Sequence, residues 1–164
     1  MKTLLVMRHA KSDWSAAQAD FDRPLNKRGR RDVPQLARLL GTLEEGPRLI
    51  LSSPAARARE TAEGLGTVLD SGVLVFDQRL YLAPPQVLGV VLGEQDDRCD
   101  PLLVIGHNPG LEEWLSLLCG GSLRLTTAGL AALELEAERW SEVRPGLGRL
   151  QWLFIPRLAE GLSR

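Results

Sequence analysis

The chain contains two histidines, and each of them follows a short apolar run that is typical of a buried strand. His9 follows a run that ends with Arg8, and His107 follows a second run much later in the chain. A third run, Leu49–Ser53, leads directly toward Arg57. Ligands of open α/β sheets bind beyond the carboxyl ends of the strands. We therefore expect these two histidines and two arginines to share one pocket.

Two imidazoles beside two guanidiniums are suited to a phosphoryl group. The planar fork of an arginine can bond two phosphoryl oxygens at once, and it keeps its charge at any working pH. A neutral imidazole is a competent nucleophile toward phosphorus when its other ring nitrogen donates to a carbonyl or a carboxylate. A second, charged histidine could stabilise the transition state. Helix N-termini at Ser53-Pro54 and Asn108-Pro109 would add backbone N–H donors.

The composition is that of an ordinary globular domain. The 164 residues are 44% apolar and 25% charged with a net charge of −1, so we expect one domain over residues 1–164. The near-neutral charge and 5% aromatic content argue against nucleic acid or an anionic membrane surface as partners. Cys99 and Cys119 are too few for a disulfide framework or a zinc site, and the apolar stretch before Arg8 is too short for a signal peptide. These features predict a cytoplasmic protein.

Strand patterns alternate with helical patterns, which predicts an α/β fold with three α/β/α layers and a mostly parallel central sheet. The predicted strands are Thr3–Arg8, Arg48–Ser52, Val73–Phe76, Leu102–Ile105, Ala131–Ala137 and Arg149–Ile155. The predicted helices run from Asn26 (N-cap) to Gly41, from Ser53 (N-cap) and Pro54 to about Leu69, over Pro85–Gly93, and from Asn108-Pro109 to Gly120-Gly121. Pro34 either kinks the first of these helices or places its start near Asp32.

Four regions resemble motifs of the histidine phosphatase (phosphoglycerate-mutase-like) superfamily. Leu5–Ala10 resembles its Arg-His-Gly signature, Ser52–Thr61 resembles its second motif, and Val104–Pro109 resembles its third. Together with Arg23–Gly29, they are similar to the small SixA-type phosphohistidine phosphatases in particular. The resemblance implies a phosphoglycerate-mutase-like fold and a metal-independent phosphatase without a cofactor.

The resemblance also implies roles at the matching positions. His9 would be the nucleophile that carries the phosphoryl group, and His107 would stabilise the developing charge. The implied phosphoryl contacts are Arg8, Arg57 and Arg23, with Ser12 and Asn108 as further candidates beside the motifs. The partner would be a phosphorylated protein or a small phosphate ester.

The chain departs from the family pattern in two places. Ala10 stands where much of the superfamily has glycine, which the SixA-like branch tolerates. Larger members place a glutamate after the second motif to protonate an alcohol leaving group, but Phe76–Tyr81 offers only Asp77. Proton donation by a placed acid contributes typically ~10²–10⁴-fold to the rate. An enzyme without this acid should prefer a leaving group that departs easily, so we expect phosphohistidine in a protein as the substrate.

Other functions stay open at this point. A small-molecule phosphomonoesterase or mutase would use Asp77 as its proton donor, and a phosphate-recognition module would bind phosphoproteins without turnover. Replacing His9 with alanine would abolish activity in an enzyme but would leave the affinity of a binding module largely intact. A zinc hydrolase would need a cluster of histidines and carboxylates, and P-loop hydrolysis would need a Gly-x-x-x-x-Gly-Lys-Ser/Thr motif; the sequence shows neither.

Several candidate residues also have ordinary structural explanations. Either histidine by itself would fit a buried core position. Arg57 is preferred to Arg59 by the motif spacing alone, and Arg23 could form a surface ion pair with the nearby Asp20. The basic run Lys27–Arg31 is interpreted most simply as a solvated helix face, with a docking patch for an acidic or phosphorylated partner as the alternative.

Overall fold

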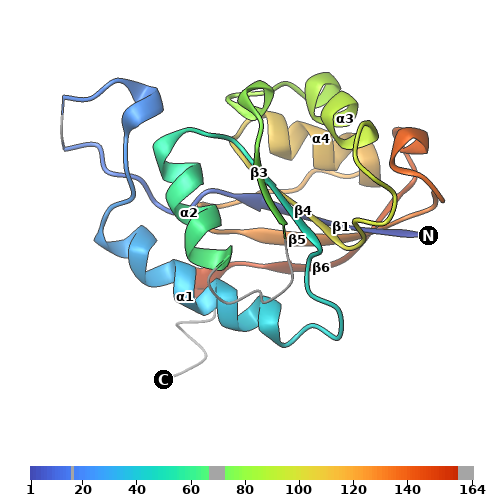
Figure 1. The fold of residues 1–164 in the computed structure, drawn as a ribbon, viewed down its shortest axis with the longest axis horizontal. Coiled ribbons are helices and arrows are strands. Elements are labelled where there is room, and N and C mark those ends of the chain that lie inside the picture. The colour runs from blue at the N-terminus through green and yellow to red at the C-terminus, as the bar shows by residue number, and fades with distance from the viewer. Residues whose placement is uncertain (16, 67–72, 159–164) are drawn as a thin grey trace.

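The computed structural model of the chain describes residues 1–15, 17–66 and 73–158, and it contains one six-stranded sheet (Figure 1). The strands are β1 Lys2–Arg8, β2 Leu49–Ser52, β3 Val73–Phe76, β4 Leu102–Gly106, β5 Leu130–Leu135 and β6 Gly148–Phe154. Their order is β3-β2-β4-β1-β5-β6, in which β1 to β4 pair in parallel and β5 and β6 pair antiparallel. The predicted mostly parallel sheet is confirmed, with small shifts of the strand ends.

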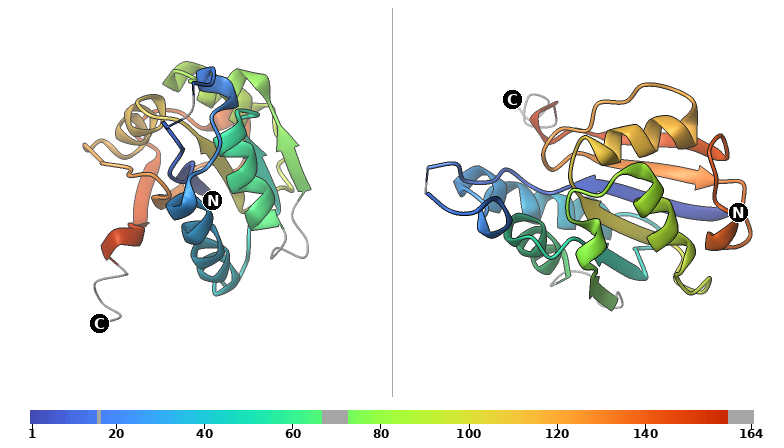
Figure 2. Two further views of the ribbon diagram at one scale, coloured as in Figure 1. Left: turned by 90° about the vertical axis from the view of Figure 1, so that its left-hand side faces the viewer. Right: turned by 90° about the horizontal axis from the view of Figure 1, so that it is seen from above.

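Helices cover both faces of this sheet. Within the described ranges they are η1 Asp20–Asp22, α1 Lys27–Gly41, α2 Ala56–Gly66, η2 Gln78–Leu80, α3 Pro85–Gly93, α4 Gly110–Cys119 and η3 Trp140–Glu142, where η marks a 3₁₀ helix. Helices α1 and α2 lie against one face, and α3 and α4 lie against the other (Figures 1 and 2). The predicted three-layer architecture is therefore confirmed. The expected end of the second helix near Leu69 lies outside the described residues. No described helix combines the length and the apolar character that crossing a bilayer requires.

Strand β1 separates two hydrophobic cores. Leu4 and Val6 belong to the core under α3 and α4, whereas Leu5 and Met7 belong to the core under α1 and α2. All four side chains are at most 1% exposed. A strand that is buried on both faces is continuously apolar rather than alternating, as this one is. Burying each of these side chains contributes about 1.5–3 kcal/mol to the stability of the fold. The strand therefore fixes the position of the residues that follow its end.

Helix α1 begins where the sequence predicts, because the side chain of Asn26 accepts a hydrogen bond from the backbone N of Gly29 at 2.9 Å. The helix then continues through Pro34, so the alternative start near Asp32 is wrong. A proline removes one backbone donor from the helix. The buried apolar face that includes Leu36 nevertheless keeps the helix packed against the sheet.

Helix α2 begins at Ala56, so the predicted start with Ser53 as N-cap and Pro54 as the first residue is wrong. The Ser53 hydroxyl accepts from the backbone N of Ala55 at 3.3 Å, before the helix, and lies 2.8 Å from Nε2 of His107. The first helical hydrogen bonds go to the backbone carbonyl of Ala55. Ser53 thus contributes to the histidine cluster rather than to the helix start.

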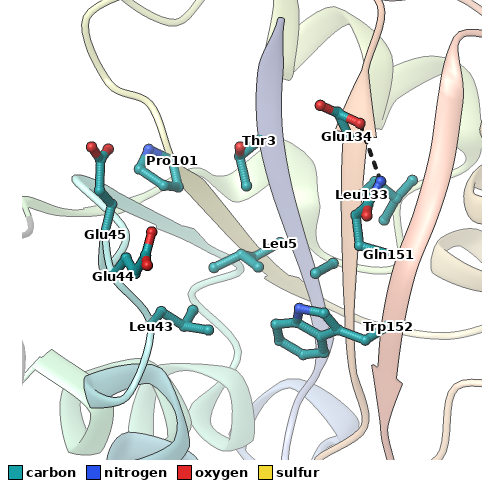
Figure 3. A pocket seen from close by; sticks show the side chains of 11 residues that line it. Thr3, Leu5, Leu43, Glu44, Glu45, Pro101, Leu133, Glu134, Gln151 and Trp152 are labelled. Atoms are coloured by element: carbon teal, nitrogen blue, oxygen red, sulfur yellow. Dashed lines mark hydrogen bonds between the residues drawn. The ribbon is translucent and has the colours of Figure 1, made fainter.

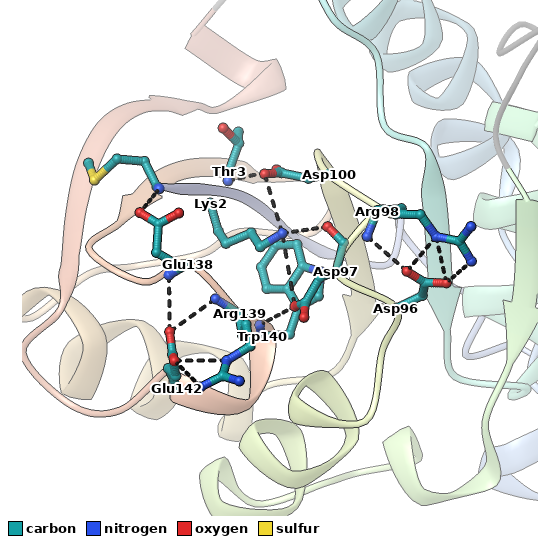
Figure 4. A network of polar contacts seen from close by, with 11 residues as sticks. Lys2, Thr3, Asp96, Asp97, Arg98, Asp100, Glu138, Arg139, Trp140 and Glu142 are labelled. Atoms are coloured by element: carbon teal, nitrogen blue, oxygen red, sulfur yellow. Dashed lines mark hydrogen bonds and ion pairs between the residues drawn. The ribbon is translucent and has the colours of Figure 1, made fainter.

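A polar network holds the end of β1 that lies opposite to the histidines (Figure 4). The buried ammonium group of Lys2 lies 3.9 Å from the carboxylates of Asp97 and Asp100, and 5.3 Å from the centre of the Trp140 ring. The carboxylate of Asp97 also accepts from the backbone N of Trp140 at 2.7 Å. Because a buried charge needs partners, this network ties the start of the central strand to η3 and to the loop before β4.

A groove of about 490 Å³ lies over the first half of β1, between the residues after α1 and the β5–β6 side of the sheet (Figure 3). Leu5, Ala132 and Trp152 line it together with the carboxylates of Glu44 and Glu45. Carboxylates repel a phosphoryl group. The groove also lies beside Thr3 and Leu5, several residues before His9, which follows the end of β1. This groove is therefore not the site that the sequence predicts.

Candidate active site

Three parallel strands end at one edge of the sheet and bring the two histidines together. The backbone N of His9 donates to the carbonyl of Gly106 at 3.2 Å, which ties the residue after β1 to the end of β4. The backbone N of Ser53 donates to the carbonyl of Ile105 at 3.0 Å, which ties the residue after β2 to the same strand. The rings of His9 and His107 consequently lie with their centroids 5.1 Å apart.

The imidazole of His9 is oriented through both of its nitrogens. Nδ1 lies 2.7 Å from the carbonyl oxygen of Ala10, and a carbonyl can only accept, so Nδ1 carries the proton. Nε2 is then unprotonated, and it accepts from Nε of Arg57 at 3.2 Å. Burial, together with the positive charges nearby, lowers the pKa of His9 well below its usual value. His9 is therefore a neutral imidazole whose free lone pair faces an arginine.

The imidazole of His107 has the opposite tautomer. Its Nδ1 lies 3.3 Å from Nη2 of Arg57, and a guanidinium can only donate, so Nδ1 accepts. Its Nε2 carries the proton and donates to the Ser53 hydroxyl at 2.8 Å. Burial and the Arg57 charge lower the pKa of His107 to about 3. One guanidinium thus contacts both rings.

Arg57, and not Arg59, points into the site. The Arg57 side chain is 2% exposed, whereas the side chain of Arg59 is 44% exposed. Arg59 lies on the outer side of α2, where it pairs with Glu63 at 3.5 Å and stacks on the ring of Phe76. The two arginines are two positions apart on one helix, so they point in different directions. The choice of Arg57 over Arg59, which the motif spacing indicated, therefore agrees with the structure.

Arg8 and Asn108, each next to one of the two histidines in the sequence, share a hydrogen-bond acceptor. Nη1 of Arg8 and Nδ2 of Asn108 both donate to the carbonyl oxygen of Leu125, at 3.4 Å and 2.9 Å. Among the described residues, Nε of Arg8 and Oδ1 of Asn108 are buried without a hydrogen-bond partner. Buried polar groups normally have partners, so an unpaired guanidinium N–H beside two histidines is a donor available to an anionic ligand.

Arg23 reaches the cluster from the loop that precedes α1. Its Nη1 donates to the Ser12 hydroxyl, and its Nη2 pairs with the Asp20 carboxylate at 2.8 Å. The ring of Trp14 stacks on the guanidinium at 3.5 Å, while the Trp14 side chain itself is largely exposed. The ion pair with Asp20 does form, but the Arg23 side chain is 9% exposed, so this arginine is not an ordinary surface residue.

Asp20 and Tyr81 are part of the site, and sequence reasoning did not identify either as functional. The Asp20 carboxylate accepts from Nη2 of Arg57 at 3.0 Å and from the Tyr81 hydroxyl at 2.6 Å. The Tyr81 ring packs edge-on against His107, with centroids 5.5 Å apart. Tyr81 is the only tyrosine in the chain, but nothing in its spacing relates it to the other motifs. The one available signal was the position of Asp20 close to Arg23 in a loop without apolar periodicity.

Asp77 is not brought to the histidines by any described contact. Its carboxylate is engaged by the guanidinium of Arg79 at 2.7 Å and accepts from the backbone N of Arg79 at the start of η2. These hydrogen bonds hold the pKa of Asp77 below its usual value, so the group is ionised at neutral pH. An ionised carboxylate that is paired with an arginine is poorly suited to donate a proton.

Arginines of the basic run at the start of α1 form ion pairs. Nε of Arg28 lies 3.6 Å from the Asp32 carboxylate, and Nη2 of Arg30 lies 3.6 Å from the carboxylate of Glu60. These pairs agree with the interpretation of a solvated helix face. In the part of the chain that the structure describes, the cluster of histidines and arginines is the place where positive charge gathers at the ends of the parallel strands.

This fold and this sequence define a histidine phosphatase. The chain belongs to the histidine phosphatase superfamily (branch 1), whose family model matches residues 4–80. It is of the SixA type within that superfamily. An uncharacterised protein of Mycobacterium tuberculosis is 33% identical to it, over 92% of this chain and 100% of the relative.

Solved SixA structures share the architecture. A crystal structure assigned as the phosphohistidine phosphatase SixA of Agrobacterium tumefaciens has a TM-score of 0.81 at 28% identity, covering 94% of this chain and 98% of that chain. The protein histidine phosphatase SixA complexed with tungstate also has a TM-score of 0.81, at 23% identity, covering 96% and 99% of the two chains. The phosphoglycerate-mutase-like fold is therefore confirmed, and the protein is placed among phosphatases.

Proposed function

We propose that this protein is a metal-independent phosphatase that removes the phosphoryl group from phosphohistidine in a protein through an intermediate on His9. The observation that carries the proposal is the orientation of the His9 ring. Its Nδ1–H is directed to the carbonyl oxygen of Ala10, and its unprotonated Nε2 faces the interior of the arginine cluster. A nucleophile toward phosphorus needs this free lone pair and this fixed tautomer.

The reaction consists of two displacements. In the first, Nε2 of His9 forms a bond to phosphorus while the bond between phosphorus and the substrate imidazole breaks, and the substrate ring, which has taken a proton from solvent on its other nitrogen, leaves as a neutral imidazole with that electron pair. In the second, a water oxygen bonds to phosphorus, the bond to Nε2 breaks, and one water proton is released to solvent. Splitting one difficult displacement into two easier ones is the gain of covalent catalysis.

Three guanidiniums supply the positive charge that this reaction needs. Arg57 donates to both histidines, and the charges of Arg8 and Arg23 are close enough to His107 to help lower its pKa. Phosphoryl transfer depends mainly on positioning and on fixed positive charge near the phosphoryl oxygens. Arginines in this number provide that charge without a divalent cation. The tungstate that is bound in a related SixA structure is an oxyanion of the same kind.

The choice of phosphohistidine rests on the carboxylates of the site. Asp77 pairs with Arg79, and Asp20 is held between Arg57 and Arg23. Both carboxyl groups have pKa values below the usual range, Asp77 through Arg79 and Asp20 through the Tyr81 hydroxyl first. Neither is therefore protonated to assist an alcohol leaving group. An imidazole departs more readily than an alkoxide, which favours a phosphorylated histidine as the substrate.

Hydrolysis of three substrates in the presence of a chelator tests the proposal. We expect rapid phosphate release from a phosphohistidine peptide and much slower release from a phosphoserine peptide, whose alkoxide leaves poorly without a proton donor. Release from p-nitrophenyl phosphate, whose phenolate leaves without a proton, reports whether His9 accepts a phosphoryl group at all. His9→Ala should abolish phosphate release, while Arg59→Ala, which changes an exposed arginine of the same motif that points away from the histidines, should retain it. Radioactive phosphoryl transfer to wild-type protein but not to His9→Ala would identify the intermediate.

Other outcomes would assign a different function. Faster turnover of alkyl phosphates than of phosphohistidine would favour a small-molecule phosphomonoesterase. Binding of the phosphohistidine peptide by both wild type and His9→Ala, without turnover by either, would favour a phosphate-recognition module. Loss of activity on adding a chelator, restored by a divalent cation, would contradict the metal-independent chemistry.

A further inference from the structure

The phosphoryl-binding donors of this site are engaged by a carboxylate of the same chain. Oδ1 of Asp20 accepts from Nη2 of Arg23 at 2.8 Å, and Oδ2 accepts from Nη2 of Arg57 at 3.0 Å. Oδ2 also accepts from the Tyr81 hydroxyl at 2.6 Å. Carboxylates and phosphoryl groups are bound by the same arginine donors with similar geometry. The carboxylate of Asp20 therefore stands where oxygens of a phosphoryl group on His9 would be expected to bind.

We propose that Asp20 is an internal competitor for the phosphoryl-binding donors: its carboxylate holds Arg57 and Arg23 in the free protein, leaves them when a phosphoryl group binds, and returns to expel inorganic phosphate. This inference rests on the proposed function, because it assumes that the phosphoryl group binds beside His9. It assigns to Asp20 a role in setting the affinity for phosphate and the rate of product release.

Like charges make the competition strong. A phosphoryl group bound to protein carries a charge of about −1.5 to −2 at neutral pH. An ionised carboxylate and such a group cannot share two guanidiniums at hydrogen-bond distance without repulsion. The hydrogen bond from Tyr81, followed by those from Arg23 and Arg57, holds the pKa of Asp20 well below its usual range. The carboxylate is therefore an anion whenever the enzyme works, and phosphate must displace it.

The position of Asp20 allows it to leave. Its side chain is 44% exposed, whereas those of Arg57 and Arg23 are 2% and 9% exposed. The arginines are thus fixed in the interior while the carboxylate approaches them from the solvent side. Asp20 is the first residue of η1, a single 3₁₀ turn that projects from the long loop before α1 (Figure 1). A side-chain rotation there frees Nη2 of Arg23 and Nη2 of Arg57 without disturbing the sheet, while Nη1 of Arg57 keeps its hydrogen bond to the backbone carbonyl of Asp20.

Tyr81 holds the carboxylate over the arginines. The Tyr81 ring packs edge-on with both His107 and Phe21, with centroids 5.5 Å and 5.0 Å apart. Phe21 belongs to the same turn as Asp20, so this aromatic packing positions the turn beside the site. Removing the Tyr81 hydroxyl should weaken the hold on Asp20 without changing any charge. Tighter phosphate binding by Tyr81→Phe would therefore come from the weaker hold on Asp20 and not from a change in the net charge of the protein.

Calorimetric titration with inorganic phosphate tests the competition directly on the full chain. Asp20→Asn removes the charge of the competing carboxylate, so the dissociation constant for phosphate should fall about 10-fold or more. Tyr81→Phe should lower it by a smaller factor. The control is Asp22→Asn, which removes an exposed carboxylate from the same turn and should change the dissociation constant by less than about two-fold. Circular dichroism verifies that each variant is folded, and Asp20→Ala serves as a second variant at the same position.

The kinetic consequence is equally specific. With phosphohistidine peptide as substrate, Asp20→Asn should show stronger product inhibition by phosphate and a lower kcat limited by phosphate release, visible as a burst in the first turnover. Unchanged or weaker phosphate binding by both Asp20→Asn and Asp20→Ala would overturn the inference. Equal tightening by Asp22→Asn would also overturn it, since the effect would then be one of overall charge.

The two proposals can fail separately. Tighter phosphate binding by Asp20→Asn in a protein that hydrolyses none of the three substrates would support the competition and contradict the phosphatase. Hydrolysis of phosphohistidine by a protein whose phosphate affinity does not respond to Asp20 would support the phosphatase and contradict the competition.

Discussion

Nε of Arg57 lies 3.2 Å from Nε2 of His9 and donates to it. Because a guanidinium has no acceptor, this contact requires an unprotonated Nε2, and the carbonyl of Ala10 requires a proton on Nδ1. The arginine that would hold the phosphoryl oxygens therefore also aligns the lone pair that would attack phosphorus. On binding of a phosphoryl group, the same N–H can move from the ring nitrogen to a phosphoryl oxygen.

The protonation states of the two histidines can be observed directly. We predict that both rings are neutral at pH 5.5 in the free protein, with the proton on Nδ1 in His9 and on Nε2 in His107. The reason is burial beside arginines, which lowers the pKa of His9 well below its usual value and that of His107 to about 3. Nitrogen-15 NMR of the imidazoles measures this, and the chain has only these two histidines. A ring that titrates near pH 6.5 would contradict the prediction.

Arg57 and Arg59 form a matched pair for mutation. Arg57→Ala removes a buried donor from both histidines and from the expected phosphoryl site, so kcat/KM for phosphohistidine should fall by ~10²–10³. Arg59→Ala removes only a surface ion pair and a stacking contact, so kcat/KM should stay within about two-fold. Steady-state kinetics of the two variants tests this difference. Similar losses of kcat/KM in both would contradict a specific role of Arg57 in binding the phosphoryl group.

Asp77→Asn should have little effect on any substrate. The asparagine oxygen can still accept from the backbone N of Arg79, so the start of η2 is preserved, and only the ion pair with the Arg79 side chain is weakened. We expect kcat/KM to change by less than about three-fold for both phosphohistidine and alkyl phosphates. A large loss confined to alkyl phosphates would restore Asp77 as a proton donor.

Stability should fall as the pH falls below the pKa of a free histidine. The unfolded chain gains protons on both imidazoles below pH 6.5, whereas the folded protein resists them because both pKa values are lowered. The contribution of the buried neutral rings is thus complete above pH 6.5 and is lost progressively toward pH 3. Between pH 7.5 and 5.5 the loss is about 1.4 kcal/mol for each histidine.

Urea unfolding at these two pH values measures that loss. His107→Asn removes one titrating group from the unfolded chain, so its free energy of unfolding should decline less over the same pH interval than that of the wild type. Equal declines in both proteins would mean that His107 takes up its proton in the folded state as readily as in the unfolded state.

Alanine substitutions of two helix glycines should change the stability in opposite directions, because one glycine is required by packing and the other is not. A Cβ on Gly110 would lie 1.9 Å from the carbonyl oxygen of Ala83, so α4 could not keep its place in Gly110→Ala. We expect a loss of about 1–3 kcal/mol in the free energy of unfolding and reduced activity, because the backbone carbonyl of His107 accepts the first hydrogen bond of this helix. Gly89→Ala in α3 meets no atom within 4 Å and should stabilise the protein by about 0.5–1 kcal/mol. Thermal unfolding separates the two.

The strand ends were predictable because a buried parallel strand has a continuous apolar signal. That signal places Arg8 at the end of β1 and His9 directly after it, Ser53 after β2 and His107 after β4. Parallel strands end at one edge of the sheet. The helix starts were less predictable. Ser53 and Pro54 match the usual start of a helix, but the hydroxyl of Ser53 accepts from His107, and α2 begins later.

The sequence by itself determined the class of fold, the edge of the sheet where chemistry gathers, and the two histidines and two arginines at the strand ends there, because these follow from local patterns and from order along the chain. Arg23 was implied only by the resemblance to a family motif. Only the tertiary structure decided what those side chains contact: which nitrogen of each imidazole is protonated, that Asp77 faces Arg79, and that Asp20 covers Arg57 and Arg23. Hydrogen bonds between side chains from different loops depend on distances and directions that no spacing along a chain encodes.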